Sequence, residues 1–315
     1  MPLQSETAPA VDSSVDQKPD ADTMAQTETS FFGRLAARCK KLDTLLCVGL
    51  DPHTAELAEP KDAEAAFKFC EKIVNNTKHI AACYKPNAAF FEVFGAEGVT
   101  VLERVLALIP DEIPIVLDAK RGDIGSTSAA YASAAYDHLN CGSMTVSPYL
   151  GLDAMAPFLR KDRAIFALCK TSNPGSNDFQ TLPLSLENMT EDQKKLADGC
   201  TKLYHYVARK CTHDNDNVGL VVGATDIEAI TWIRKDNAKV WMLSPGVGAQ
   251  GAQLDPALAA GLCPEGLGIL IAVSRGISKA ADQKSAADNF VKEIRESRDR
   301  VRADGSPASK RAKLA

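Results

Sequence analysis

Eight short runs of apolar and β-branched residues recur along the chain, separated by longer stretches with helical spacing. The runs are Leu45–Leu50, Ala82–Asn87, Ile113–Lys120, Ser143–Tyr149, Ala164–Lys170, Val218–Thr225, Lys239–Gly246 and Gly268–Arg275. Helical stretches lie near residues 63–78, 97–108, 126–139, 151–159, 191–211, 226–236 and 280–296, with a weaker one near 256–260. This alternation is typical of βα units, which build a parallel sheet.

The number of βα units and the length of chain that they occupy indicate that the sheet closes into a barrel. Eight βα units over about 265 residues match the usual size of a (β/α)8 TIM barrel. An open, doubly wound sheet is the alternative, but no Gly-x-Gly-x-x-Gly follows the first run. Polar residues instead follow nearly every run, and in a barrel these ends meet at one mouth. We therefore predict a single α/β barrel domain over residues 30–296.

The two ends of the chain differ from the barrel in composition. Residues 1–29 are rich in Ala, Ser, Thr, Asp, Gln and Pro, and residues 297–315 are polar and end in a short basic patch. Neither segment has enough large apolar residues to order itself. We expect a disordered N-terminal tail and a disordered, polar and basic C-terminal tail.

Charge and targeting patterns exclude several classes of protein. The formal net charge of -5 argues against a nucleic-acid surface, which normally shows a basic excess. The sequence shows no secretory signal and no apolar run long enough to span a bilayer, so we expect a cytoplasmic protein without a membrane partner. The nine cysteines are odd in number and widely spread, which predicts buried, reduced thiols.

A dense charge cluster closes the third run, in the segment Asp118-Ala119-Lys120-Arg121-Gly122-Asp123. Alternation along a strand places Asp118 and Lys120 on the same face, and the turn at Gly122 lets Asp123 fold back or reach a neighbouring chain. A substrate carboxylate about 4 Å from either Asp would be repelled by roughly 4 kcal/mol at an effective dielectric of about 20. The cluster predicts a site that expels a carboxylate as CO2.

Lys85 ends the second run in an apolar context, where an unpaired ammonium costs several kcal/mol. Asp51 follows the first run and Asp118 ends the third, so both flank Lys85. We expect Asp51, Lys85, Asp118 and Lys120 to form one network of alternating charge. A set of ion pairs on the rim of the barrel is the alternative.

Glycines and an arginine follow the last two runs, where barrels commonly bind phosphate. Ser244-Pro245-Gly246-Val247-Gly248-Ala249-Gln250 ends the seventh run, and Ser274-Arg275-Gly276 ends the eighth. Glycines allow backbone N–H groups to approach phosphate oxygens, while Arg275 supplies a bidentate charged contact and Gln250 a neutral donor. We predict a phosphate site here, against the alternative that the glycines only form turns.

Other common site chemistries find little support. The five histidines show no His-x-x-x-His spacing, and we expect no metal site. The sequence also contains neither a Walker A motif nor a Gly-x-Ser-x-Gly elbow, which argues against hydrolase chemistry.

The segment Leu117 to Thr127 resembles the signature of the orotidine 5'-phosphate decarboxylase family. Four further segments resemble the longer branch of that family, found in many bacteria and some protists. They are Val48-Gly49-Leu50-Asp51-Pro52, Tyr84-Lys85-Pro86-Asn87, Lys170-Thr171-Ser172-Asn173-Pro174-Gly175 and Ser244 to Gln250. The resemblance covers about Phe31 to Glu296, and each motif falls at the expected strand end.

The resemblance implies a cofactor-free lyase that converts orotidine 5'-phosphate into UMP and CO2, as a homodimer with two shared active sites. It implies that Lys120 protonates C6 and that Asp118 crowds the substrate carboxylate. It implies that Asp51 and Lys85 hold the ribose hydroxyls and the charge network, and that Asp123 and Thr127 enter from the other subunit. Ser172 or Thr171 should contact the pyrimidine ring, and Gln250 with Arg275 the phosphate. Pro245, Ser274 and Gly276 are further expected substrate-binding residues. Some family members are fused to orotate phosphoribosyltransferase, and this chain is expected to carry at most one activity, either alone or as part of such a fusion.

Two other functions stay open. Sugar-phosphate decarboxylases and aldolases of the same barrel superfamily resemble the Asp-x-Lys-x-x-Asp cluster but use Mg²⁺. A non-catalytic nucleotide-binding barrel would bind UMP without releasing CO2.

Overall fold

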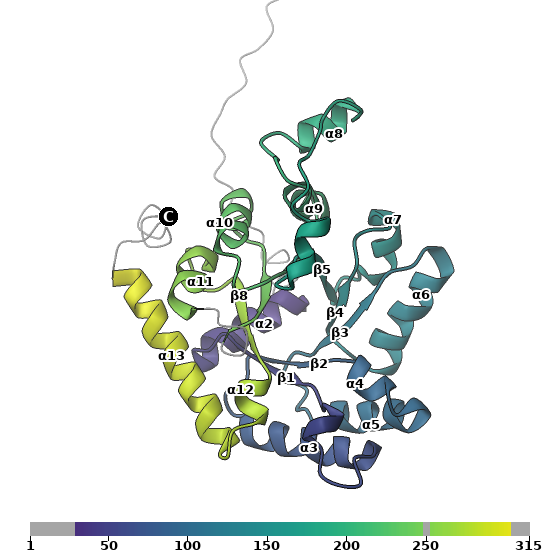
Figure 1. Ribbon diagram of the computed structural model, residues 1–315, viewed down its shortest axis with the longest axis vertical. Coiled ribbons are helices and arrows are strands. Elements are labelled where there is room, and N and C mark those ends of the chain that lie inside the picture. Colours follow the sequence, from purple (N-terminus) through teal and green to yellow (C-terminus); the bar gives the residue numbers. More distant parts are fainter. Residues whose placement is uncertain (1–28, 248–252, 304–315) are drawn as a thin grey trace, which may run out of the picture.

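The computed structural model describes residues 29–247 and 253–303 of the chain. Eight strands form one parallel sheet in the order β2-β1-β8-β7-β6-β5-β4-β3. They are β1 (Leu46–Leu50), β2 (Cys83–Pro86), β3 (Val116–Arg121), β4 (Ser143–Val146), β5 (Ala164–Lys170), β6 (Val218–Val222), β7 (Met242–Pro245) and β8 (Ile269–Val273). Figure 1 shows the strands at the centre of the molecule and the helices outside them. Each strand overlaps one of the eight predicted runs.

The two edge strands of this sheet, β2 and β3, approach each other. Isolated parallel bridges join Tyr84 to Ile115 and Asn87 to Asp118. The backbone N–H of Tyr84 also donates a hydrogen bond to the carbonyl of Pro114 at 3.0 Å. These contacts make the sheet a nearly closed barrel, which confirms the predicted (β/α)8 TIM fold and excludes the open-sheet alternative.

Helices follow the strands as the sequence predicts. The longer ones are α3 (Ala63–Thr77), α5 (Gly95–Ala107), α6 (Gly125–Ser133), α9 (Leu203–Thr212), α10 (Ile227–Asp236), α11 (Leu254–Gly261) and α13 (Gln283–Ala303). The short ones are α4 (Ala89–Glu92), α7 (Leu152–Met155), α8 (Glu191–Leu196) and α12 (Arg275–Ser278).

The helical stretch predicted at 191–211 is divided in two. A capping box at Thr190 begins α8, and Gly199, with a φ of +72°, lies in the turn that separates it from α9. Figure 1 shows α8 projecting away from the barrel. The chain between β5 and α9 is therefore an excursion from the βα pattern.

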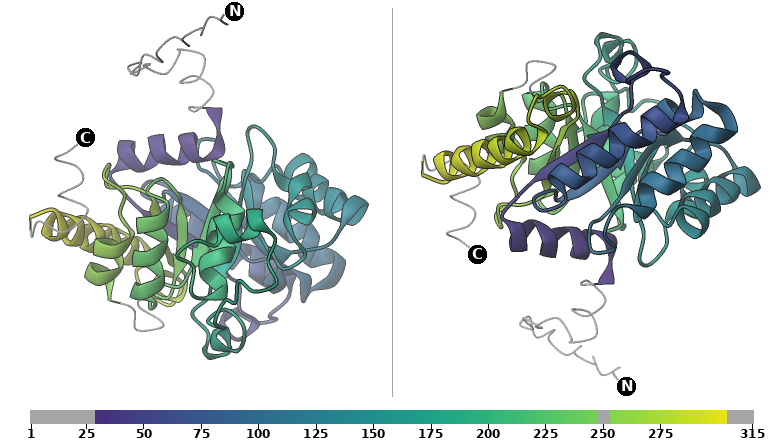
Figure 2. Two further views of the ribbon diagram at one scale, coloured as in Figure 1. Left: turned by 90° about the horizontal axis from the view of Figure 1, so that it is seen from above. Right: turned by 90° about the horizontal axis from the view of Figure 1, so that it is seen from below.

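One helix that the sequence analysis did not assign, α2 (Phe31–Leu42), packs across the end of the barrel at which the strands begin (Figure 2). Phe32 stacks on Trp241 with ring centroids 6.2 Å apart, and Phe31 meets the edge of Phe166 at 6.4 Å. This helix covers one end of the barrel, so the polar mouth lies at the other end.

The expected boundary of the C-terminal tail at 297 is wrong. Helix α13 continues to Ala303, and Ser297, Arg298 and Val301 are buried. Arg298 forms an ion pair with Asp43, which follows α2. The helical face therefore extends past Glu296 because it still packs on the barrel. The rest of the expected tails, residues 1–28 and 304–315, lies outside the described residues.

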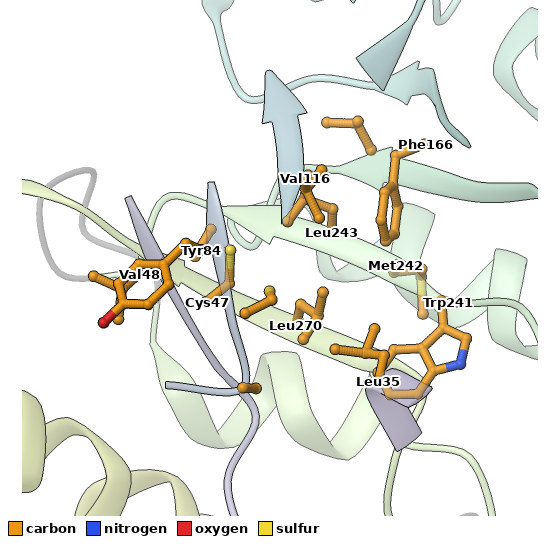
Figure 3. Packing of buried hydrophobic residues seen from close by; sticks show 14 of the residues in the cluster. Leu35, Cys47, Val48, Tyr84, Val116, Phe166, Trp241, Met242, Leu243 and Leu270 are labelled. Carbon is orange, nitrogen blue, oxygen red and sulfur yellow. The ribbon is translucent and has the colours of Figure 1, made fainter. Parts of the chain in front are cut away.

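The strands pack in a buried apolar core. Figure 3 shows buried residues from several strands, among them Tyr84, Val116 and Leu270. Tyr84 lies on the face of β2 that is covered by helices, because its hydroxyl bonds to that of Thr77 in α3. Strands β1, β2, β4, β6 and β8 are buried at every position, as expected for a parallel sheet covered on both faces. All nine cysteines are buried and free, which confirms the prediction of reduced thiols. In the described part of the chain, no helix is both long and apolar enough to cross a membrane.

Candidate active site

A buried lysine lies between two carboxylates at the mouth of the barrel. Lys85 is in β2, Asp51 follows β1 and Asp118 is in β3. The Nζ atom of Lys85 lies 2.9 Å from Oδ2 of Asp118 and 4.0 Å from Oδ1 of Asp51. Nζ of Lys120 lies 2.6 Å from the other oxygen of Asp118, Oδ1. The structure therefore brings the four predicted charges together, with Asp118 between the two lysines.

Burial and ion pairing act in opposite directions on these groups. Burial raises the pKa of Asp118, but attraction to Lys85 and Lys120, with their hydrogen bonds, outweighs it and lowers the pKa to about 2. Burial lowers the pKa of Lys85, but attraction to Asp51 and Asp118 outweighs it and raises the pKa above its usual range. Both groups are therefore charged at neutral pH.

The two lysines differ in accessibility. The side chain of Lys85 is 10% exposed, whereas that of Lys120 is 49% exposed. Lys120 is therefore the more accessible ammonium of this network, and Asp118 is the carboxylate beside it.

Thr145 joins this network without having been singled out from the sequence. It lies in β4, is fully buried, and its hydroxyl donates a hydrogen bond to Oδ1 of Asp118 at 2.9 Å. The backbone N–H of Lys120 donates to the same hydroxyl at 2.9 Å. A threonine inside an apolar run is typical of any strand, so no sequence signal marked it.

A cavity of about 320 Å³ opens beside the network at the ends of β1, β7 and β8. Residues that line it include Asp51, Lys85, Pro245, Ser274, Arg275 and Gly276. The residues predicted for a sugar and for a phosphate therefore share one cavity. A Cβ at Gly49 would lie 2.7 Å from Cβ of Ser274, so only glycine allows β1 to approach this wall so closely. Gln250, also predicted for the phosphate, lies outside the described residues.

Two polar atoms in this region are left without partners. Oδ1 of Asp51 and Oγ of Ser244 are buried, and neither accepts or donates a hydrogen bond within the described ranges. Such atoms cost free energy unless a partner reaches them. Because Asp51 lines the cavity, a hydroxyl group of a bound ligand can supply the missing donor.

Thr171 and Ser172 follow β5 and line a second cavity of about 470 Å³. Thr171 is tied into its own loop, because its backbone N–H donates to Oε1 of Gln180 at 2.8 Å and its hydroxyl donates to Oδ1 of Asn173 at 2.7 Å. Ser172 instead packs against Gly223 at the end of β6, where an added Cβ would lie 2.8 Å from its own. These adjacent residues therefore differ in their contacts.

The last residue of β5, Lys170, forms a second buried ion pair. Its Nζ lies 3.2 Å from Oδ2 of Asp226 and donates a hydrogen bond to Oγ of Ser176 at 2.7 Å. Asp226 also accepts a hydrogen bond from the backbone N–H of Ala229 and so caps α10. This pair connects β5, the loop after it and α10.

Asp123 and Thr127 line neither of the two cavities described above. Asp123 follows β3, and its Oδ1 accepts a hydrogen bond from the backbone N–H of Ile124 at 2.8 Å. Thr127 is exposed on α6. Within the described residues, Lys120 pairs with Asp118 and no ion pair joins it to Asp123.

The arrangement has a definite chemical capacity. Lys120 is an accessible proton donor, and the adjacent carboxylate of Asp118 stays ionised and repels negative charge. Arg275 lines the neighbouring cavity, and a guanidinium can bind an anion. A phosphorylated, carboxylate-bearing ligand suits this combination of groups.

Comparisons with known proteins agree with this chemistry. The model of the orotidine 5'-phosphate decarboxylase / HUMPS family matches residues 44–290. An orotidine 5'-phosphate decarboxylase from Roseiflexus castenholzii is 42% identical over 276 residues, which cover 85% of this chain and 96% of the relative.

Two solved structures from Leishmania donovani are also similar. Its OMP decarboxylase superposes with a TM-score of 0.75 and 46% identity, over 85% of this chain and 98% of that one. Its UMP synthase superposes with a TM-score of 0.76 and 46% identity, over 85% of this chain and 56% of that one. The chain belongs to the orotidine 5'-phosphate decarboxylase / HUMPS family.

Proposed function

We propose that this protein is an orotidine 5'-phosphate decarboxylase, which converts orotidine 5'-phosphate into UMP and CO2 in the last step of de novo UMP synthesis. The observation that carries the proposal is the array Lys85, Asp118 and Lys120, in which one ionised carboxylate lies between a buried and an accessible ammonium. The similarity to the Roseiflexus castenholzii decarboxylase supports the same reaction.

In the proposed reaction, the carboxylate at C6 of the substrate lies beside Asp118. Repulsion between the two carboxylates destabilises the bound substrate by roughly 4 kcal/mol at 4 Å and an effective dielectric of about 20. The bond between C6 and the carboxylate breaks, CO2 leaves, and the electron pair stays on C6. The ammonium of Lys120 stabilises this pair by its charge and then donates a proton to C6, which gives UMP. Lys120 regains its proton from solvent.

The rest of the substrate is assigned to the cavity of about 320 Å³. Oδ1 of Asp51, which accepts no hydrogen bond from the described residues, suits a ribose hydroxyl, with Lys85 beside it. Arg275 suits the phosphate, together with Ser274 and the glycine-bearing segment that begins at Pro245 and includes Gln250. Binding energy from these remote groups helps to position the ring.

Ser172, rather than Thr171, is assigned to the pyrimidine ring. The hydroxyl of Thr171 already donates to Asn173 and accepts a hydrogen bond from Nε2 of Gln180 at 3.0 Å. Thr171 then keeps the loop in place, and Ser172 meets the ligand.

The reaction is proposed to need no cofactor and no metal. The ammonium of Lys85 occupies the space between Asp51 and Asp118, where a divalent cation would otherwise bind two carboxylates. The test is the loss of orotidine 5'-phosphate absorbance, measured with and without EDTA. Equal activity in both is expected.

Two results would contradict the proposal. Activity that disappears in EDTA and returns with Mg²⁺ indicates the sugar-phosphate chemistry of the same superfamily. Binding of UMP without release of CO2 indicates a non-catalytic nucleotide-binding barrel.

The active protein is proposed to be a homodimer in which Asp123 and Thr127 enter the site of the partner. Three observations support this. Asp123 does not pair with Lys120 of its own chain, Ile124 beside it is 60% exposed, and Tyr149 after β4 is 90% exposed. Large apolar side chains around the mouth suit burial against a second copy.

Subunit sharing can be tested with two inactive variants. A chain with Asp123→Asn retains Lys120, and a chain with Lys120→Ala retains Asp123. Mixing them should restore part of the activity through hybrid sites. No recovery despite demonstrated subunit exchange would argue against sharing.

Two further points are proposed. The first is a cytoplasmic location, which is the compartment expected for an enzyme of nucleotide biosynthesis. The second is a fusion with orotate phosphoribosyltransferase, which is supported by the similarity of this chain to 56% of the Leishmania donovani UMP synthase.

A further inference from the structure

The pairing of β3 with β4 is irregular at the centre of the charge network. Leu117 lies opposite Met144, and the next pair is Arg121 with Val146. Asp118, Ala119 and Lys120 therefore all stand opposite Thr145 alone. Lys120 has a φ of +47°, which is a left-handed conformation that side-chain-bearing residues rarely adopt.

Such an irregularity interrupts the backbone hydrogen bonds of a strand pair. The backbone N–H of Lys120 bonds to a side chain, the hydroxyl of Thr145, at 2.9 Å. Because an N–H can only donate, the hydroxyl accepts here and its own hydrogen points to Oδ1 of Asp118, also at 2.9 Å. One buried hydroxyl thus joins the strained backbone of Lys120 to the carboxylate of Asp118.

We infer that Thr145 is a positioning residue for the reaction, which sets the carboxylate of Asp118 and the backbone of Lys120 in one fixed relation. This inference rests on the proposed function. Thr145 is 1% exposed, so it acts through these two residues and does not itself meet the substrate.

The geometry explains why a hydroxyl is needed. Oδ1 of Asp118 accepts both from Thr145 and from Nζ of Lys120 at 2.6 Å. Without this hydroxyl, the carboxylate of Asp118 can rotate toward the ammonium of Lys120. The backbone N–H of Lys120 also loses the hydrogen bond that offsets the cost of its left-handed conformation. Proton donor and carboxylate would then shift relative to the substrate.

The test is Thr145→Val, which retains size and β-branching but removes both hydrogen bonds. We expect kcat to fall about 10- to 100-fold, because small displacements of reacting groups have effects of this size. KM should change less than about threefold, because no substrate contact is lost. Thr145→Ser retains the hydroxyl and should keep kcat within about threefold of the wild type.

A matched control distinguishes positioning from general destabilisation. Thr77 in α3 is also fully buried, and its hydroxyl bonds to the carbonyl of Ile73 and to the hydroxyl of Tyr84, each at 2.7 Å. Thr77→Val removes an equivalent hydroxyl from the outer layer of the barrel. It should lower Tm as Thr145→Val does, but leave kcat within about twofold.

Three outcomes overturn the inference while leaving the proposed function intact. In the first, the wild type is active and Thr145→Val lowers kcat no more than Thr77→Val does. In the second, Thr145→Ser is as slow as Thr145→Val. In the third, Thr145→Val raises KM and leaves kcat unchanged. If Thr145→Val does not fold, Thr145→Cys replaces it, because a thiol bonds more weakly than a hydroxyl. A Cys variant as active as the Ser variant would then contradict the inference. A wild type without decarboxylase activity instead contradicts the proposed function.

Discussion

Two buried lysines, Lys85 and Lys170, lie in the last two residues of β2 and β5, and each pairs with a carboxylate from a neighbouring element. Lys85 lies between the carboxylates of Asp51 and Asp118, and Asp118 in turn contacts the exposed Lys120. The second lysine, at the end of β5, contacts a single carboxylate and a loop hydroxyl. On the β1–β3 side, the shared carboxylate therefore holds a second ammonium that is half exposed. On the β5–β6 side, Lys170 is 6% exposed, and its carboxylate partner pairs with no second ammonium within the described residues.

This difference teaches how similar ion pairs serve different purposes. A buried pair that closes on a loop and a helix cap fixes the chain at that place. A buried pair that supports a further, accessible ammonium presents that ammonium in a fixed position. The variants below test whether the two sides differ in this way.

The largest effect is expected for Lys120→Ala. Turnover of orotidine 5'-phosphate should fall by about 10³- to 10⁴-fold, because the proton donor is lost. The side chain is half exposed and Asp118 keeps Lys85 and Thr145 as partners, so the free energy of unfolding should change by less than about 1 kcal/mol. Steady-state kinetics and urea unfolding measure the two quantities. Turnover close to that of the wild type would sink the assignment of Lys120.

Lys85→Met should affect stability as well as activity. Removing the buried ammonium leaves Asp51 without its ion pair and Asp118 with only Lys120, and an uncompensated buried charge costs about 3–5 kcal/mol. Urea unfolding at neutral pH checks this value, with Lys120→Ala as the matched control. Equal stability of the two variants would show that both lysines are solvated ion pairs of the rim.

The ion pairs of Asp118 also predict a pH dependence of stability. The pKa of Asp118 is lowered to about 2, below the unfolded value of about 3.9, so ionised Asp118 stabilises the fold by roughly 2–3 kcal/mol. This contribution is complete above about pH 5 and is lost as the pH falls through about 2. The difference in unfolding free energy between wild type and Asp118→Asn should shrink over this range. A difference that does not depend on pH would contradict the depressed pKa.

The smallest effect is expected for Lys170→Met on the other side of the mouth. Asp226 is 27% exposed and can regain water, so the free energy of unfolding should fall by about 1–3 kcal/mol. The loop that bears Ser172 loses its bond to Ser176, so KM should rise while kcat stays within about threefold. A loss of kcat as large as that expected for Lys120→Ala would contradict this and would indicate that Lys170 acts in the reaction with Lys85, Asp118 and Lys120.

The path from sequence to site can be traced through particular residues. Alternation placed Asp118 and Lys120 on one face, and their contact at 2.6 Å agrees with this. The expected alternation is not regular, however, because the strand is distorted at Lys120 and Thr145 completes the pairing. A period of two residues cannot predict a distortion that depends on the neighbouring strand.

Helices α2 and α13 show the same limit at the level of the fold. Phe31 and Phe32 were not assigned to an element, and Ser297 was placed in a tail, yet all three are buried. Helix α2 does carry a local signal, because its apolar residues recur at helical spacing after the N-cap Ser30. The sequence around Ser297 is polar, and packing on the barrel buries it.

The sequence by itself determined the eight βα units, the closed barrel and the identity of the charges at the strand ends, because strand period and strand-end position are local properties. Only the tertiary structure decided which charges meet, that Lys85 is buried while Lys120 is exposed, and that Thr145 joins Asp118 to the backbone of Lys120. These relations depend on the register between strands, and register is set by the packing of the whole barrel.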